Sequence, residues 1–178
     1  MWGSFTACRR LSLLVIGALR ARDTVLAMPA EIDIAPVATS EFEQMLPLIA
    51  AYQRFYEVDE IDEDRNRAFF PRFLAPSEDG MLIGARDGGH LVGYACLYWH
   101  FSSTQAKETV LMNDLYVDEA VRGQGVGRAL IEASAAVARE RGAPYLEWAT
   151  APDNLTAQRL YDSTGAERSE WVEYELGL

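Results

Sequence analysis

Three glycines alternate with other residues at one point of the chain, in the stretch Val121-Arg122-Gly123-Gln124-Gly125-Val126-Gly127. Glycine allows tight backbone turns, so several N–H groups can converge on one point. An apolar, alanine-rich stretch typical of a helix follows, and a helix that begins here adds the positive end of its dipole. Arg122 and Arg128 can pair with negative charge directly. The spacing therefore predicts a pocket for an anion, of the kind that binds phosphate groups.

Two common phosphate-binding motifs do not fit this loop. The Gly-Lys-Ser/Thr ending of a Walker loop is missing, and the spacing and chain position of the glycines do not suit a Rossmann fold. A plain glycine-rich turn is the remaining alternative, and glycines alone are weak evidence against it. The elements on either side of the loop carry the further information.

Those elements follow a regular order. Gly80–Arg86 and Leu91–Phe101 read as two strands joined by an Asp-Gly-Gly-His turn, a typical hairpin signal. Thr109–Val117 is a third strand, which leads into the glycine loop. A helix over residues 127–141 follows, and Gly142 closes it. The loop therefore lies between a strand and a helix.

The rest of the chain supplies three strands and three helices. The patterns predict strands at 32–37, 144–150 and 171–176, and helices at about 40–56, 64–74 and 154–163. The order is β-α-α-β-β-β-α-β-α-β, which is typical of a mixed α/β domain.

Length and composition limit the functional class. With 178 residues, 49% of them hydrophobic, the chain can form one domain with a sizeable core. The net charge of -11 argues against non-specific nucleic-acid binding and is compatible with a cationic substrate. Cys8 and Cys96 have no paired spacing, which fits a reducing compartment. Neither histidine has ligand partners at metal spacing, so no metal site is predicted.

The first 27 residues differ in character from the rest. Two arginines precede a short apolar run, Leu11–Leu19, and Val25-Leu26-Ala27 resembles a cleavage site, which together outline a signal peptide. The run is too short to span a membrane, and charged residues interrupt the stretch that follows it. Met28 reads as an ordinary protein start. We favour the interpretation that residues 1–27 are an upstream extension and that residues 28–178 form a single domain, with the signal peptide as the alternative.

The combination of these motifs resembles the GNAT superfamily of N-acetyltransferases. Its phosphate loop has the pattern Arg/Gln-x-x-Gly-x-Gly/Ala, which Arg122, Gly125 and Gly127 match. The stretch Asn113-Asp114-Leu115-Tyr116-Val117 is similar to small fungal members linked to histones, polyamines or D-amino acids. The resemblance implies a mixed, mostly antiparallel sheet of six to seven strands flanked by about four helices. A homodimer is compatible with it, because dimers are common in the family.

The resemblance also implies acetyl-CoA as the co-substrate. The backbone of the strand before the loop is expected to bind the pantetheine arm like an added strand, the loop amides to hold the pyrophosphate, and Asn154 to bond the arm from the far side. The residues assigned to the cofactor are Leu115, Tyr116, Val117, Arg122, Gly123, Gln124, Gly125, Val126, Gly127, Arg128 and Asn154.

Tyr161 is expected, by the same resemblance, to lie near the sulfur and to protonate the leaving thiolate as a general acid. The alternative is a core tyrosine on an amphipathic helix. The spacing from Asn154 to Tyr161 favours the catalytic interpretation. An intact Tyr161 also disfavours a second class of function, a domain that binds acyl-CoA as a sensor without turning it over.

The acceptor is expected to be a primary amine of a small molecule or peptide, and the sequence leaves its identity open. The polyamine-type relatives carry a Glu-Asp pair where this chain has Asn113-Asp114, which leaves the general base open too. Asp114 and Glu147 are the carboxylates left on the two central strands, either to relay a proton or to bind a cationic amine. Tyr56 and Trp99 complete the candidate acceptor residues. An enzyme that uses acetyl-CoA is expected in the cytoplasm, with no nucleic-acid or membrane partner.

Overall fold

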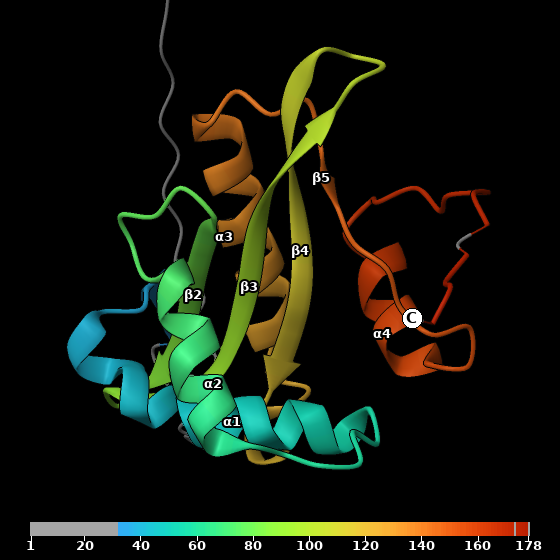
Figure 1. Cartoon of the computed structure of the whole chain (residues 1–178). Helices are drawn as coiled ribbons and strands as arrows, with labels where there is room; N and C mark the ends of the chain where they lie inside the picture. The colour runs from blue at the N-terminus through green and yellow to red at the C-terminus, as the bar shows by residue number, and fades with distance from the viewer. Residues whose placement is uncertain (1–31, 173, 178) are drawn as a thin grey trace, which may run out of the picture.

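The computed structural model describes residues 32–172 and 174–177, so the predicted extension over residues 1–27 lies outside the described residues. Figure 1 shows a central sheet of five strands in the order β1-β2-β3-β4-β5. The pairs β1–β2, β2–β3 and β3–β4 are antiparallel, and the pair β4–β5 is parallel. The strands are β1 (Asp33–Pro36), β2 (Gly80–Asp87), β3 (His90–Ser102), β4 (Lys107–Val117) and β5 (Leu146–Glu147).

Four α-helices accompany the sheet. Figure 1 shows α1 and α2 on one face of the sheet, α3 on the other, and α4 beyond β5. They are α1 (Phe42–Phe55), α2 (Glu63–Phe69), α3 (Val126–Glu140) and α4 (Leu155–Asp162). Short 3₁₀ turns occupy residues 39–41, 70–73 and 119–121. The expected mixed, mostly antiparallel α/β class with about four helices is confirmed.

Each face of the sheet carries its own apolar core. On one face, α1 and the turn after α2 bury residues such as Met45, Ile49 and Phe73 against the sheet. On the other face, α3 buries Leu130 and Ile131, and partly buried side chains from α4 join that cluster. Leu160 and Tyr161 pack against this second core, so side-chain contacts hold α4 against the rest of the domain.

A nearly buried ion pair fixes the first strand and the start of α1. The Arg86 guanidinium on β2 donates to both carboxylate oxygens of Glu41, at 2.6 and 2.7 Å. It also donates to the carbonyl oxygens of Ala35 and Pro36 on β1. Hydrogen bonding from Arg86 is the main reason that the pKa of Glu41 is lowered to about 2.

In the described residues the sheet has fewer strands than the sequence predicts, and the first and last of them are shorter than expected. The strand expected at 144–150 is reduced to two residues, and the strand expected at 171–176 does not form in the described residues of that segment. Trp171 and Tyr174 are 91% and 95% exposed. The segment has the alternating pattern of a strand, but a strand needs a neighbour, and a two-residue β5 offers almost no edge to pair with. The expectation of six to seven strands is therefore corrected to five.

None of the helices within residues 32–172 and 174–177 combines the length and the apolar character needed to cross a bilayer.

Candidate active site

A pocket opens where β4 and β5 separate. These strands pair only at Val110↔Leu146 and Leu111↔Glu147. The register of β4 against β3 then slips by one residue, because Cys96 is opposite Asp114 while Leu97 is opposite Met112. A bulge of this kind bends a strand and increases its twist. Within the described residues, the β5-facing edge of β4 beyond Leu111 therefore has no strand partner, and a pocket of about 540 Å³ fills the gap.

The glycine loop forms one wall of this pocket. Gly123 and Gly125 have φ values of +80° and +88°, which residues with a side chain rarely adopt. Gly125 is the N-cap of α3. The first helical bond runs from the Ala129 amide to the Gly125 carbonyl at 3.0 Å, and within the described residues the N–H groups of 123–128 have no protein acceptor. A row of free donors thus stands at the positive end of a helix.

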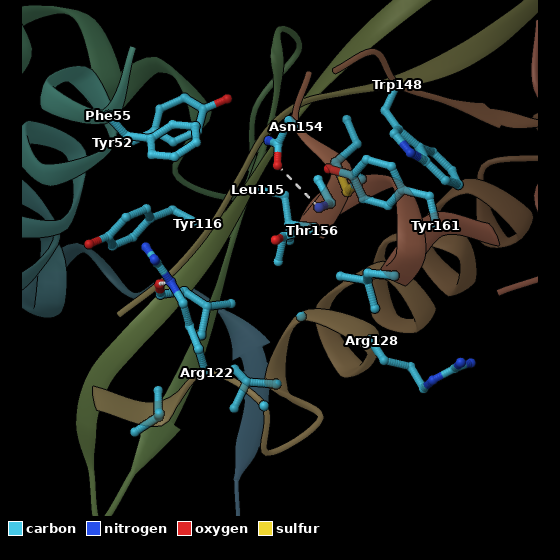
Figure 2. Close-up of a pocket in the computed structure, with 18 of the residues that line it drawn as sticks. Tyr52, Phe55, Leu115, Tyr116, Arg122, Arg128, Trp148, Asn154, Thr156 and Tyr161 are labelled. Atoms are coloured by element: carbon cyan, nitrogen blue, oxygen red, sulfur yellow. Dashed lines mark hydrogen bonds between the residues drawn. The ribbon is translucent and has the colours of Figure 1, made fainter. Parts of the chain in front are cut away.

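The two arginines of the loop point in different directions, as Figure 2 shows. Arg122 runs along β4, donates to the Val117 carbonyl at 3.0 Å and lies over the Tyr116 ring at 5.8 Å. Arg128 turns away from the pocket and donates to the carbonyl and hydroxyl of Ser163 at 2.8 and 2.7 Å. Arg122 is therefore the guanidinium closer to the open strand edge, while Arg128 joins α3 to the end of α4.

The third glycine has a packing role. A Cβ added to Gly127 would lie 3.0 Å from the Leu160 side chain of α4. The small residue lets α4 approach the start of α3, and this approach holds the opposite wall of the pocket in place.

α4 supplies that opposite wall. Asn154 is the N-cap of α4, and its Oδ1 accepts a bond from the Ala157 amide at 3.1 Å. The amide nitrogen of its side chain remains free for a ligand, because the cap uses only the oxygen. Figure 2 shows Asn154 and Tyr161 on the same side of the pocket.

Tyr161 lies against Trp148, with the rings edge to face and their centroids 5.5 Å apart. Both residues line the pocket. Burial, with a smaller contribution from Tyr56, raises the pKa of Tyr161 to about 12. At neutral pH the phenol therefore keeps its proton and can donate it.

Aromatic side chains of α1 face Tyr161 across the pocket. Tyr52, Phe55 and Tyr56 all line it, and the rings of Tyr52 and Tyr56 meet edge to face at 4.9 Å. Burial, followed by the charge of Asp114, raises the pKa of Tyr52 well above its usual value. Tyr56 is among the candidate acceptor residues named from the sequence, but Tyr52 and Phe55 are not. Three aromatic residues within five positions at the end of one helix could have predicted this aromatic wall of the pocket.

Asp114 lies one layer behind the pocket. The residue is 7% exposed, and the Asn113 side-chain amide, at the bulge, donates to its Oδ1 at 2.9 Å. Burial raises the pKa of Asp114 to about 6, although the hydrogen bond from Asn113 opposes the shift. Asn113 itself lines the pocket.

The other two candidate acceptor residues lie at the far end of the sheet, outside the pocket. Glu147 lies 3.2 Å from the His100 ring nitrogen and 3.5 Å from the Thr109 hydroxyl. Trp99 stacks under the Arg141 guanidinium at 3.9 Å. The structure therefore brings together the loop, Asn154, Tyr161 and Tyr56, but not Trp99 or Glu147. No cluster of three or more possible metal ligands occurs in the described part of the chain.

Comparison with known proteins gives consistent matches. The family model of the acetyltransferase (GNAT) family matches residues 45–166. An uncharacterized N-acetyltransferase, YhfO of Bacillus subtilis, is 32% identical over 147 residues, covering 82% of this chain and 97% of that protein. The D-amino-acid N-acetyltransferase HPA3 of Saccharomyces cerevisiae is 42% identical over 94 residues, covering 52% of this chain and 58% of that protein. The crystal structure of a probable acetyltransferase superimposes with a TM-score of 0.73 at 29% identity, covering 82% of this chain and 97% of that chain.

Proposed function

The chain belongs to the acetyltransferase (GNAT) family, and on that premise we propose that it transfers the acetyl group of acetyl-CoA directly to a primary amine, with Tyr161 as the general acid. The observation that carries the proposal is the arrangement of the pocket. Gly123 and residues 125–128, whose amides are free, the unpaired edge of β4 and the protonated Tyr161 all border one continuous space.

The donor groups fit coenzyme A in kind and in order. The N–H groups at the start of α3 suit a pyrophosphate, and Arg122 adds a positive charge beside them. Leu115, Tyr116 and Val117 line the pocket along this stretch of β4, and its edge suits an extended arm that carries amide groups, which can bond a strand edge as another strand does. The Val117 carbonyl accepts from Arg122, and the arm would replace that bond. The side-chain amide of Asn154 reaches the same arm from α4. The co-substrate supplies the activated acetyl group as a thioester.

The chain's contribution is positioning and proton transfer. The amine, held against the aromatic wall of α1, attacks the carbonyl carbon as a neutral group. As the carbon–nitrogen bond forms and the carbon–sulfur bond breaks, the sulfur takes a proton from the Tyr161 hydroxyl. Trp148 fixes the ring of Tyr161 through its edge-to-face contact. The phenol then regains a proton, which the amide nitrogen gives up.

The acceptor in this proposal is a primary amine of a small molecule or peptide. The similarity to a D-amino-acid N-acetyltransferase makes amino acids the first class to test, and Tyr52, Phe55 and Tyr56 suit an acceptor with an apolar part. Trp99 and Glu147, which lie outside the pocket, have no role in it. A reaction that draws on acetyl-CoA places the protein in the cytoplasm, where that metabolite is made.

The test uses the purified full chain with acetyl-CoA and a panel of D- and L-amino acids, polyamines and lysine peptides. Release of free thiol and the mass of the acetylated product are measured together, and acetyl-CoA binding is measured by calorimetry. Transfer to at least one amine is the expected result. Binding of acetyl-CoA with no transfer to any member of the panel would contradict the proposal and support a sensor domain instead.

A further inference from the structure

A second, smaller cavity lies beside the active-site pocket. It has a volume of about 430 Å³, and Phe55, Tyr116 and Arg122 line both spaces. Figure 2 shows these three side chains on the side of the active-site pocket away from Tyr161. The two cavities therefore adjoin along this wall, and an extended ligand that passes between these side chains would reach from one cavity into the other.

Charged side chains of both signs line the second cavity. They are two arginines and two carboxylates, Arg54, Arg122, Asp118 and Glu119. The Arg122 guanidinium lies 3.2 Å from the Glu119 carboxylate, so these two charges compensate each other. Within residues 32–172 and 174–177, neither Arg54 nor Asp118 has an oppositely charged group within 4.0 Å, and the two do not pair with each other. The cavity thus has one cation and one anion that lack a counter-charge.

These two charges come from different elements, and local structure holds each in place. Arg54 lies in the last turn of α1, where the helix dipole stabilises a cation. Asp118 follows β4, and its backbone amide donates to the Val92 carbonyl of β3 at 2.8 Å. One oxygen of its carboxylate accepts from the Ala120 amide at 2.9 Å, and the second oxygen has no donor in the described part of the chain. That oxygen can accept from a ligand.

A cation and an anion that line one cavity suit a ligand that carries both charges. The head of an amino acid is such a group, because its ammonium and its carboxylate are bonded to the same carbon. A guanidinium recognises a carboxylate through two parallel hydrogen bonds, and a carboxylate accepts strongly from an ammonium. A ligand with a single charge would be attracted by one of the two side chains and repelled by the other.

We propose that this second cavity binds the zwitterionic head of a diamino acid, with Arg54 on its carboxylate and Asp118 on its α-ammonium, while the distal amine reaches the active-site pocket. The inference rests on the proposed acetyl transfer and names its acceptor class. The methylene chain of the acceptor crosses the wall at Phe55 and Tyr116, whose rings offer apolar contact.

The distal nitrogen forms the new carbon–nitrogen bond while the carbon–sulfur bond of the thioester breaks. The sulfur takes a proton from Tyr161, and the phenol regains the proton that the amide nitrogen loses. The head of the acceptor takes no part in these bond changes. It contributes affinity and selectivity rather than a lower barrier, because its contacts are the same before and during the reaction.

The test removes the two charges of the acceptor one at a time. Lysine carries both, 6-aminohexanoate lacks the α-ammonium, cadaverine lacks the carboxylate, and pentylamine lacks both. Ornithine, 5-aminopentanoate, putrescine and butylamine form the same set with one methylene fewer. kcat and KM are measured for both sets with the wild type, Arg54→Gln and Asp118→Asn. The asparagine keeps an oxygen that can accept from the Ala120 amide. Comparison with authentic standards determines which nitrogen of lysine and ornithine is acetylated.

Each variant should weaken only the acceptors that carry the matching charge. In the better of the two sets, Arg54→Gln should raise KM about 10-fold for the diamino acid and the ω-amino acid, and leave the diamine and the monoamine unchanged. Asp118→Asn should raise KM about 10-fold for the diamino acid and the diamine, and leave the other two unchanged. kcat should change little in either variant. The wild type should favour the diamino acid and acetylate its distal amine.

Arg139→Gln and Asp62→Asn are matched controls. Arg139 also lies in the last turn of a helix, and Asp62 also accepts a backbone N–H with its side chain as a cap. Neither residue lines either cavity, so both variants should keep the wild-type KM for every amine.

A rise in KM of equal size for all four members of a set would overturn the proposal, because it would show a general disturbance of the site. Unchanged KM values in both variants would overturn it too, as would acetylation at the α-nitrogen or a wild type that acetylates the monoamine as efficiently as the diamino acid. In each of these cases the wild type still transfers acetyl groups, and the proposed function stands. A wild type that acetylates no amine would disprove the proposed function itself, and the acceptor class with it.

Discussion

Trp148 holds Tyr161 edge to face, with the two ring centroids 5.5 Å apart, at the junction of the short strand β5 and helix α4. The contact fixes the phenol ring through its apolar faces and leaves the hydroxyl free to meet a ligand. Ring and hydroxyl thus have separable roles, which a Tyr→Phe change can distinguish.

Tyr161→Phe should lower kcat by roughly 10²–10⁴-fold, because it removes the acid and keeps the ring. Acetyl-CoA affinity and melting temperature should change little. Turnover at saturating acetyl-CoA is measured over a range of pH, with calorimetry for binding. Tyr145→Phe, at a tyrosine that does not line the pocket, is the matched control. A Phe variant with full turnover at every pH would remove Tyr161 from the mechanism.

Gly125→Val should weaken acetyl-CoA binding by at least 10-fold, because a β-branched residue cannot hold a φ of +88° without strain and its side chain obstructs the approach to the loop amides. Gly142→Val is the matched control. Gly142 also has a positive φ, +73°, and lies beyond the other end of α3, away from the pocket. Both variants should lose stability, but only the first should lose affinity. An equal affinity in the two folded variants would contradict the phosphate-loop assignment.

Asp114→Asn should stabilise the protein at pH 7–8 by about 2 kcal/mol. The pKa of Asp114 is raised from 3.8 to about 6 on folding, so the native state binds the proton more tightly and its stability falls as pH rises through that window. Asparagine never ionises and avoids this loss. Urea unfolding at pH 4 and pH 8 measures the effect, which should vanish at pH 4. A variant that is destabilised equally at both values would show that the carboxylate has a structural role instead.

Glu41→Gln should destabilise the protein at pH 7 by about 1–3 kcal/mol, because it removes the nearer counter-charge of the Arg86 guanidinium and leaves only the exposed Asp33 at 3.8 Å. The pH dependence of this stability contribution is opposite in sign to that of Asp114. The pKa of Glu41 is lowered to about 2, so its contribution is complete above its ordinary value of 4.5 and is lost as pH falls toward 2. Denaturant unfolding from pH 2 to 7 should show the difference shrinking in acid. Activity per folded molecule should stay unchanged, and a specific loss of turnover would contradict this purely structural role.

The conformation of the glycine loop and its two flanking elements could be predicted from the sequence because their information is local. Positive φ at Gly123 and Gly125 is a property that only glycine satisfies easily, and the strand before them and the helix after them both have clear periodicity. The sequence also predicted a helix from 154 to 163, and the structure places Asn154 at its N-cap, a position that depends on residues within one turn.

The relation of Asp114 to Tyr52 could not be predicted in this way. It depends on a one-residue register shift between β3 and β4, because that shift determines which side chains of β4 face α1. No pattern in the sequence predicts the shift. The shortness of β5 is equally non-local, because it follows from the separation of two strands rather than from the preferences of residues 144–150. The segment after α4 was predicted as a strand from its sequence but does not form one in the described residues. Trp171 and Tyr174 lie in an alternating pattern, yet no strand edge is there for the segment to pair with.

The two-residue contact between β4 and β5 also bears on how long the protein survives in a cell. Because only two residue pairs join β4 and β5, we expect local unfolding to begin by separation of these strands. Local unfolding exposes the backbone to proteases. A ligand that bonds the free edge of β4 stabilises the closed form by RT ln(1 + [L]/Kd), which is about 2.7 kcal/mol at 100 times Kd. Half-life would then follow the supply of the activated acyl donor, so that a shortage of the metabolite reduces the amount of the enzyme as well as its rate.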